Sequence, residues 1–532
     1  MQEQGNRFTR FKRFLNTVRA ENLILCVYTA ICCFLILVHE PWRDEAQFWL
    51  LARDASLPEI LTNISREGIP PLWQLLIKPF VMIGLPYYPT MNIISTLLVA
   101  AAAWIFVKKA PFHRYAKYIL LFSPVFIYSY ATISRSYALL PLVIVLLAIV
   151  YPKRLQRPIV YGLLIALLFE VHVFIWGLVA ALAIEFLIST IQAYKKDKRV
   201  KQAIKSLTAA IPLLIVALVY LIWFYPGAKA SNTLADFAVK TNPLNILHKL
   251  FFGVGSVFGN TLECSELFGI KILLILLTFA VISIIRNKRW LKYVLIAGVS
   301  ILFEGIIAGF VYKDGNFRSI SVFLILTFMV WLAKNDQLPL EIKLFSTRTT
   351  WVAVLCAYTF FGFLTVVPLI ADDILNPYSN SRTTAAYIEE TIPADSLILT
   401  SSNAEISSLS AYLKDYTFYD SEKEKPFTFY IWDGFANWES LYGVETNGVR
   451  QLLPDQRLYL VAKEAIARST GDEDGFYYIT LADFAPNKAG TVYWDHVIYA
   501  TLEEQESMEN YEILYMSFAD ANQLVKSYDN PA

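Results

Sequence analysis

The residues best suited to do chemistry lie in the stretch Pro41–Trp49, directly after the first apolar run that is long enough to cross a membrane. This stretch holds Arg43, Asp44 and Glu45 among aromatic and apolar residues. Charged side chains beside lipid are costly to hold and need a partner or a task. A carboxylate pair can accept a proton from a hydroxyl or bind a divalent cation through its oxygens. The pair can equally be a solvated turn that Arg43 pins in place, and both interpretations stay open.

The composition predicts the membrane setting. Of 532 residues, 56% are hydrophobic and 15% aromatic, and many apolar runs reach membrane-spanning length. Residues 1–371 hold 36 Lys and Arg against 18 Asp and Glu, whereas residues 372–532 hold 10 against 27. This asymmetry predicts two domains: a transmembrane domain over 1–371 with a long first outer loop (40–88), and an acidic soluble domain over 372–532. The acidic half argues against a nucleic-acid partner, because phosphate binding needs clustered Lys and Arg.

The apolar runs and the basic clusters together predict a polytopic α-helical plasma-membrane protein. Basic clusters such as Lys153–Arg157 and Arg286–Arg289 follow even-numbered spans, which predicts a cytoplasmic N-terminus and an extracytoplasmic C-terminal domain. That assignment requires Leu72–Gly84 to lie along the outer surface rather than cross. The eleven predicted spans are 22–39, 89–107, 118–132, 136–151, 158–171, 173–193, 206–225, 267–285, 291–311, 317–333 and 351–370.

This topology places several polar residues at the outer ends of spans, where residues far apart in sequence converge. Arg135 could be a snorkelling interfacial arginine, and His172 could be a satisfied core histidine. Arg318 could anchor its span by pairing with Asp314, although a planar guanidinium also suits a lipid phosphate. The glycine- and aromatic-rich outer segment 225–266 could be a mobile flap over a lipid or an ordinary interfacial loop. The candidate residues for substrate binding are Arg43, Lys78, Arg135, Tyr137, His172 and Arg318.

The order and common sidedness of several short motifs resemble the GT-C superfamily of glycosyltransferases that use polyprenyl-phosphate-linked sugars. This superfamily includes bacterial protein mannosyltransferases and aminoarabinose transferases. The acidic pair after the first span is one such motif. Gly68–Trp73 is similar to the superfamily's His-Pro-Pro-Leu landmark, with Ile69 where the histidine stands. Ser134–Leu139, the span-end His172 and the late outer Arg318 have counterparts there, and the resemblance covers about residues 1–420.

The resemblance implies an inverting transfer at the outer face of the membrane, from a polyprenyl-phosphate sugar to an acceptor hydroxyl on a glycan, lipid or protein. Such a reaction needs a carboxylate to take the acceptor proton and cations to stabilise the leaving phosphate. We assign Asp44 as the base and Glu45 as its orienter or replacement. Arg318, with Arg135 or Lys78, would hold the phosphate. No obligatory cofactor is expected, although the acidic pair could instead hold Mg²⁺ or Mn²⁺.

The acidic half has the pattern of a small α/β domain. Ser396–Thr400 reads as a buried strand, followed by a helical pattern over Asn403–Leu413 and a strand at Thr417–Tyr419, which favours a parallel pair. Further predicted strands are Phe427–Trp432, Leu458–Ala462, Val497–Thr501 and Ile513–Ser517.

Two other classes of protein remain compatible with the sequence. A lipid or polysaccharide transporter would also bury polar residues among many spans, but it would usually carry charges near span centres and an inverted repeat. A non-catalytic subunit of a cell-envelope assembly would tolerate replacement of Asp44. The one-sided gathering of charges favours the enzyme.

Overall fold

The computed structural model describes residues 17–62, 67, 69–197, 205–230, 243–310, 316–339, 350–375, 379, 381–394, 397–400, 406–420, 425–431, 458–463, 479–483 and 511–516. These residues divide into two compact units. The first comprises Met1–Ile36, Gly68–Leu72 and Asn92–Ala371, as far as they are described, and the second comprises Leu37–Glu67, Trp73–Met91 and Asp372–Ala532 to the same extent. The predicted first outer loop therefore packs largely with the acidic half.

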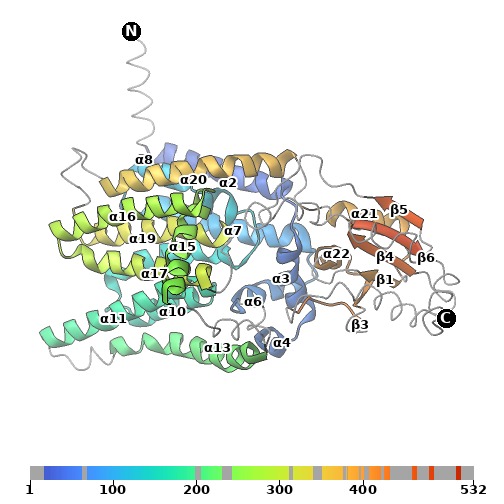
Figure 1. Cartoon of the computed structure of the whole chain (residues 1–532), viewed down its shortest axis with the longest axis horizontal. Coiled ribbons are helices and arrows are strands. Elements are labelled where there is room, and N and C mark those ends of the chain that lie inside the picture. The colour runs from blue at the N-terminus through green and yellow to red at the C-terminus, as the bar shows by residue number, and fades with distance from the viewer. Residues whose placement is uncertain are drawn as a thin grey trace, which may run out of the picture. The chain divides into compact units, whose positions relative to one another are not determined.

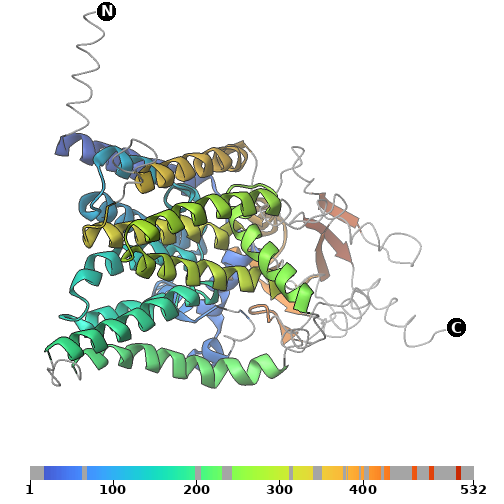
Figure 2. The same cartoon turned by 60° about the vertical axis from the view of Figure 1, so that its left-hand side comes forward.

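The first unit is helical. Its helices α15, α17 and α19 lie next to one another in both views (Figures 1 and 2). The helices that lie wholly or mostly in this unit are α2 (Val18–Val38), α7 (Tyr87–Lys109), α8 (Arg114–Leu121), η1 (Val125–Ser129), η2 (Ser136–Ala138), α9 (Leu139–Val150), η3 (Tyr151–Lys153), α10 (Pro158–Phe169), η4 (Val173–Ile175), α11 (Trp176–Asp197), α13 (Ala210–Ala230), α15 (Pro243–Thr261), α16 (Glu266–Arg286), α17 (Trp290–Phe310), α18 (Asn316–Ser319), α19 (Ser321–Asn335) and α20 (Thr350–Leu375).

The helix lengths confirm a polytopic membrane protein. Eight of the described helices are long and apolar enough to cross a bilayer, and each coincides with one of the eleven predicted spans. The predicted spans 158–171 and 317–333 correspond to the shorter apolar helices Pro158–Phe169 and Ser321–Asn335. The helix in the predicted surface segment, α6 (Leu72–Met82), has 11 residues. At about 1.5 Å per residue it is too short to cross a hydrocarbon core of about 30 Å.

The predicted span 118–132 is not one continuous helix. Helix α8 ends at Leu121, and a π-helical turn, η1, follows from Val125 to Ser129. Pro124 stands at the break, and its missing N–H cannot continue the α-helical hydrogen bonding. The chain then turns through buried Ser134 and Arg135 before the next helix begins, which brings an arginine to the end of a span.

The expectation of a flap or interfacial loop over 225–266 is wrong for its described part. Residues 243–261 form helix α15, which packs against both α16 and α17. Glycine permits this close approach, because a Cβ added at Gly253 would lie 2.2 Å from the carbonyl oxygen of Gly305. Small residues at such contacts allow membrane helices to pack backbone to backbone.

The second unit combines most of the predicted first outer loop with the acidic half. Helix α3 packs against α22, and Arg53 of α3 donates hydrogen bonds to the Ser410 carbonyl oxygen of α22 at 2.7 Å and to its hydroxyl at 3.3 Å. The elements of this unit are α3 (Arg43–Asp54), α4 (Leu57–Thr62), α6 (Leu72–Met82), α21 (Ser381–Thr391), β1 (Leu397–Thr400), α22 (Ile406–Tyr412), β2 (Thr417–Asp420), β3 (Lys425–Pro426), β4 (Leu458–Lys463), β5 (Ile479–Asp483) and β6 (Tyr511–Met516).

The strands form a mixed six-stranded sheet in the order β3-β2-β1-β4-β6-β5. Strand β1 pairs in parallel with β2 and with β4, whereas β6 runs antiparallel to β4 and β5. The predicted parallel pair around the helical segment is confirmed, as are the predicted strands at β4 and β6. The prediction of a strand over 427–432 is wrong for its described residues 427–431, because this ladder ends at Pro426. Strand β5 was not predicted, and Val497–Thr501 lies outside the described residues.

Candidate active site

Most of the candidate residues, with other charged side chains around them, gather at one place in each unit. In the second unit they surround the start of helix α3, where Glu45 caps the helix. Its Oε2 atom accepts a hydrogen bond from the Trp42 backbone N–H at 3.2 Å. This contact satisfies a donor that the helix itself leaves unpaired, and a carboxylate in the first turn also interacts favourably with the helix dipole. Glu45 is therefore part of the local scaffold.

A buried histidine binds this cap to Asp373, in the last turn of helix α20. The Nε2 atom of His39 lies 3.1 Å from Glu45 Oε2, and its Nδ1 lies 2.9 Å from Asp373 Oδ2. Burial by itself would lower the pKa of His39, but the carboxylates of Asp373 and Glu45 outweigh it and raise that pKa to about 10. His39 is thus a cation at neutral pH, held between two carboxylates. The triad joins residues more than three hundred positions apart.

The carboxylates of this cluster differ in their access to solvent. Glu45 and Asp373 have side chains that are 0% and 1% exposed. Glu40 is also buried, and its Oε1 accepts a hydrogen bond from the Arg382 backbone N–H at 2.6 Å. The side chain of Asp44 is 21% exposed, and its Oδ1 lies 3.7 Å from Arg43 Nε. Among these four carboxylates, Asp44 is the one that a substrate can reach.

The two other basic candidates of this unit have different surroundings. Lys78 donates hydrogen bonds from its Nζ to the carbonyl oxygens of Ala52 at 3.0 Å and Ala55 at 2.8 Å. It therefore caps the C-terminal end of α3, where carbonyl groups lack helical partners. Arg43 lies over the Trp42 ring, with its Cζ 5.6 Å from the ring centroid, and its side chain is 25% exposed.

In the first unit, the remaining candidates form a cationic and aromatic cluster. The guanidinium carbon of Arg135 lies 5.2 Å from the centroid of the Tyr137 ring, and that ring lies 5.2 Å from the ring of His172. The Phe174 ring contacts both, with its centroid 4.8 Å from that of His172 and 5.7 Å from that of Tyr137. Helices η2 and η4 position these residues, and both follow turns at the ends of predicted spans. The structure thus brings Arg135, Tyr137 and His172 together, close to Arg318.

The electrostatics of this cluster suit an anion. Burial, followed by the charges of Arg318 and Arg135, holds the pKa of His172 well below its usual value, so its imidazole is neutral. Its Nδ1 accepts a hydrogen bond from the Phe174 N–H at 3.3 Å, which leaves the proton on Nε2 available to donate. The buried Tyr137 hydroxyl has no hydrogen-bond partner among the described residues. Two guanidinium groups, an imidazole donor and a hydroxyl are the groups that hold a phosphate.

The comparison with solved structures gives the fold. ArnT from Cupriavidus metallidurans in the apo state superposes with a TM-score of 0.51 at 12% identity, over 94% of this chain and 99% of that chain. The chain has a GT-C-like fold. The structure of the same ArnT bound to undecaprenyl phosphate superposes with a TM-score of 0.49 at 11% identity, over 93% of this chain and 97% of that one. No protein-family model matches the sequence, and neither does any curated protein.

The GT-C-like fold confirms the predicted resemblance at the level of architecture. The sequence did not single out His39, Glu40 or Asp373. A signal for the first two was present, because they stand at the end of the first predicted span and directly precede the charged stretch. The pairing of His39 with Asp373 carried no local signal. Among the described residues no group of three His, Cys, Asp or Glu side chains is arranged to hold a metal, so a role for Mg²⁺ or Mn²⁺ stays a prediction.

Proposed function

We propose that this protein is an inverting glycosyltransferase that moves a sugar from a polyprenyl-phosphate donor to an acceptor hydroxyl at the outer face of the membrane. The GT-C-like fold supports the class of reaction. The observation that carries the proposal is the cluster of Arg135, His172 and Arg318, which offers two guanidinium groups and a neutral imidazole donor. Arg135 and His172 are buried, and Arg318 is partly exposed. A lipid-linked phosphate is an anion that can bind to a multi-pass membrane protein at the ends of its membrane spans.

In the proposed reaction the acceptor oxygen attacks the anomeric carbon while the bond from that carbon to the phosphate oxygen breaks. The electron pair of the broken bond stays on the phosphate. Arg135 and Arg318 stabilise the charge that develops there, because guanidinium groups can hold phosphate oxygens through paired hydrogen bonds. His172 donates from Nε2 to a phosphate oxygen or a sugar hydroxyl. Attack from the side opposite the leaving group inverts the anomeric configuration.

The acceptor hydroxyl must also lose its proton. Asp44 is assigned as the base because it is the partly exposed carboxylate of its cluster. Glu45 keeps the cap and the ion pair with His39 that define the backbone from which Asp44 projects. The proposed roles separate two neighbouring carboxylates into one for chemistry and one for scaffold. A general base of this kind contributes about 10²–10⁴-fold to a rate.

The proposal also includes an orientation. The basic connections between spans would face the cytoplasm, with the N-terminus on that side and the acidic α/β domain on the other. Sugar donors on polyprenyl phosphate would then meet the protein in the outer leaflet, with surrounding membrane lipids as further contacts. The acceptor belongs to the class of glycans, lipids or proteins that carry a free hydroxyl.

The phosphate role is tested by Arg318→Ala and Arg135→Ala, compared with Arg157→Ala, an exposed arginine outside the cluster. Each variant of the cluster should lower kcat/KM for the donor by about 10–100-fold, as expected for loss of a charge-assisted hydrogen bond, while KM for the acceptor stays within about twofold. Steady-state kinetics with the two substrates varied in turn measures both. Equal losses for the two substrates, or none, would contradict a phosphate role.

A further inference from the structure

A second polar site lies in the first unit, at the ends of helices α11, α17 and α19 that carry the basic connections. It is a groove of about 640 Å³ that none of the candidate active-site residues lines. One wall is apolar and consists of side chains from α11 and α17 that are at least 40% exposed on the surface of membrane-spanning helices: Ile184, Ile188, Leu291, Leu295 and Val299. Its rim carries the basic residues Arg154, Lys288, Arg289 and Lys292.

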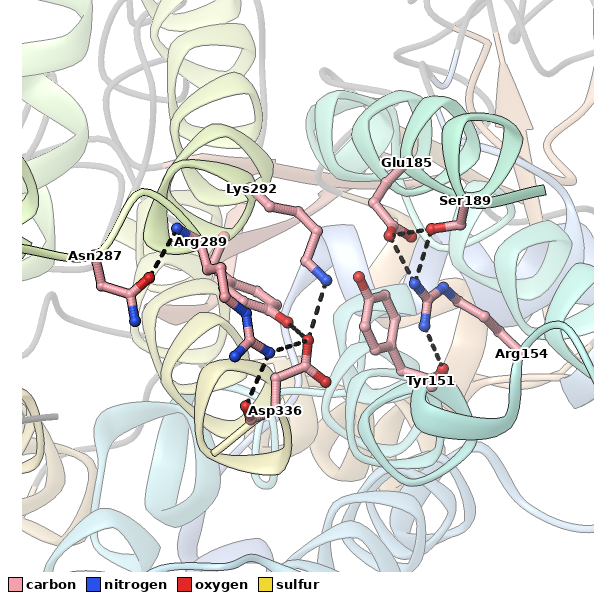
Figure 3. A network of polar contacts seen from close by, with 9 residues as sticks. Tyr151, Arg154, Glu185, Ser189, Asn287, Arg289, Lys292 and Asp336 are labelled. Carbon is pink, nitrogen blue, oxygen red and sulfur yellow. Dashed lines mark hydrogen bonds and ion pairs between the residues drawn. The ribbon is translucent and has the colours of Figure 1, made fainter. Parts of the chain in front are cut away.

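One end of the rim is fixed by Arg154 (Figure 3). Its guanidinium donates hydrogen bonds to Glu185 Oε1 at 2.7 Å and to the Ser189 hydroxyl at 2.9 Å, both on α11. A third bond runs to the Tyr151 carbonyl oxygen at 3.0 Å, and the guanidinium carbon lies 4.0 Å from the centroid of the Tyr151 ring. Arg154 is therefore held rigidly at the inner edge of the groove.

The other end is organised by Asp336, which follows helix α19. Its Oδ2 lies 3.2 Å from Lys292 Nζ, and the Tyr293 hydroxyl donates to the same oxygen. A guanidinium nitrogen of Arg289 donates to the Asp336 backbone carbonyl at 3.1 Å, and Figure 3 shows Arg289 and Lys292 both directed toward Asp336. The side chain of Arg289 is 63% exposed, so it remains accessible from outside the protein.

The charges do not cancel at this rim. Four basic side chains (Arg154, Lys288, Arg289 and Lys292) stand against two carboxylates (Glu185 and Asp336), which leaves two positive charges in excess. The exposed Lys288 makes no ion pair with any described residue. A surplus of positive charge beside an apolar wall matches a molecule with an anionic head and a hydrocarbon tail. It does not match a nucleotide, whose base and sugar are polar.

We propose that this groove binds an anionic membrane phospholipid. Its headgroup phosphate lies among Lys288, Arg289 and Lys292, and one acyl chain follows the apolar wall of α11 and α17. Basic pockets between membrane helices on the cytoplasmic side bind lipid head groups in this manner, and Lys and Arg near an anionic membrane surface strengthen the binding. The bound lipid would tie α11, α17 and the end of α19 together.

The test uses the delipidated full-length protein in detergent, given equal amounts of phosphatidylglycerol and phosphatidylcholine with the same acyl chains, with bound lipid counted by native mass spectrometry. The charge-reversed variant Lys288→Glu/Arg289→Glu should retain about tenfold less phosphatidylglycerol than the wild type, or less still. Both residues are exposed, so the fold should tolerate the change. The control Lys195→Glu/Lys196→Glu alters the same charge at exposed residues that do not line the groove, and it should bind as the wild type does.

Two further measurements separate lipid binding in this groove from lipid binding elsewhere on the protein and from binding of a soluble phosphate. Leu295→Trp should block the acyl chain and lower phosphatidylglycerol binding several-fold, whereas Leu214→Trp, on an exposed position of α13 outside the groove, should not. Equal retention of the two lipids by the wild type, or equal retention of phosphatidylglycerol by the charge-reversed and control variants, would overturn the proposal. So would complete displacement of the lipid by millimolar glycerol phosphate, because that result would show a site for a free phosphate compound.

Discussion

Two buried histidines, one in each unit, stand in opposite electrostatic settings. His39 lies between the carboxylates of Glu45 and Asp373, which raise its pKa to about 10. His172 lies near the guanidinium groups of Arg135 and Arg318, which together with burial hold its pKa well below the usual value. The first is an internal cation whose charge is already matched by the protein. The second is a neutral donor beside two cations that can bind an anion.

The difference teaches that residue type alone does not assign a role. Each histidine comes soon after a membrane helix, and each is enclosed by protein. The neighbours decide its protonation state, and that state decides whether the residue holds the fold together or meets a ligand. The same reasoning separates Asp44 from Glu45, adjacent carboxylates of which one is partly exposed and the other is fully buried in an ion pair.

The largest effect on turnover is expected when the partly exposed carboxylate, Asp44, is changed. Asp44→Asn removes the proposed base and should lower turnover by about 10²–10⁴-fold, measured as polyprenyl phosphate released per minute by the purified protein. The apparent Tm should change only modestly, because a partly exposed carboxylate in the first turn of a helix contributes at most about 2 kcal/mol. Asp54→Asn, which changes a carboxylate at the other end of the same helix, is the matched control. Near-normal turnover by the Asp44→Asn variant would show that Asp44 is not the general base.

Changing the neighbouring carboxylate, Glu45, should lower stability rather than the turnover of the folded protein. Glu45→Gln keeps the shape of the side chain but removes the charge that faces His39, and breaking a buried ion pair costs about 3–5 kcal/mol. Thermal unfolding of the purified protein should show a clear drop in Tm. Any loss of turnover should follow the loss of folded protein. A Glu45→Gln variant with normal Tm and no activity would instead assign Glu45 to the chemistry.

The pH dependence of stability should reveal the charge on His39. Because folding raises the pKa of His39 from 6.5 to about 10, its stabilising contribution is complete below about pH 6.5 and is lost as pH rises through about 10. The difference in Tm between the wild type and His39→Gln should therefore shrink from pH 7 to pH 10. A difference that is constant over this range would mean that His39 is neutral in the folded protein.

For His172 we expect the opposite pH dependence of stability, in the acidic part of the pH range. Its pKa in the folded protein lies below 6.5, so its contribution is present above that pH and declines as pH falls below it, when the unfolded chain takes up the proton. Comparing Tm of the wild type with that of His172→Gln between pH 7 and pH 5 sharpens the contrast between the two histidines. The two variants should converge with the wild type at opposite ends of the pH range.

The smallest effect is expected at Lys78. Lys78→Met keeps most of the aliphatic stem but removes the two hydrogen bonds to the end of α3, which should cost about 2 kcal/mol of stability. The KM for the donor should not change. Lys109→Met, at an exposed position in the last turn of α7, serves as the control. A large rise in the KM for the donor with normal stability would instead show that Lys78 binds the donor.

The sequence predicted the membrane helices well because the bilayer sets their length and composition. It failed where local chemistry overrides hydropathy. Pro124 breaks a span that the apolar pattern alone made continuous. Helix α15 was missed because Asn245, His248 and Lys249 lower its hydropathy, whereas the glycines that allow its packing read as loop residues.

The candidate site shows the same division. The positions of Arg135, His172 and Arg318 at the ends of spans are visible in the sequence, because charges are excluded from the hydrocarbon core. The charged state of His39 was not visible, because it depends in part on Asp373, more than three hundred residues away. Sequence patterns indicate where a charge lies along its own element. They do not show which distant partner neutralises it.

The proposed transfer is tested most directly by an assay of the purified wild-type protein in liposomes. The protein is incubated with a panel of radiolabelled polyprenyl-phosphate sugars and candidate acceptors. We expect free polyprenyl phosphate to appear together with labelled acceptor of inverted anomeric configuration, for at least one sugar. If the folded protein releases no polyprenyl phosphate from any donor in a broad panel, the result would contradict the proposed glycosyltransferase activity.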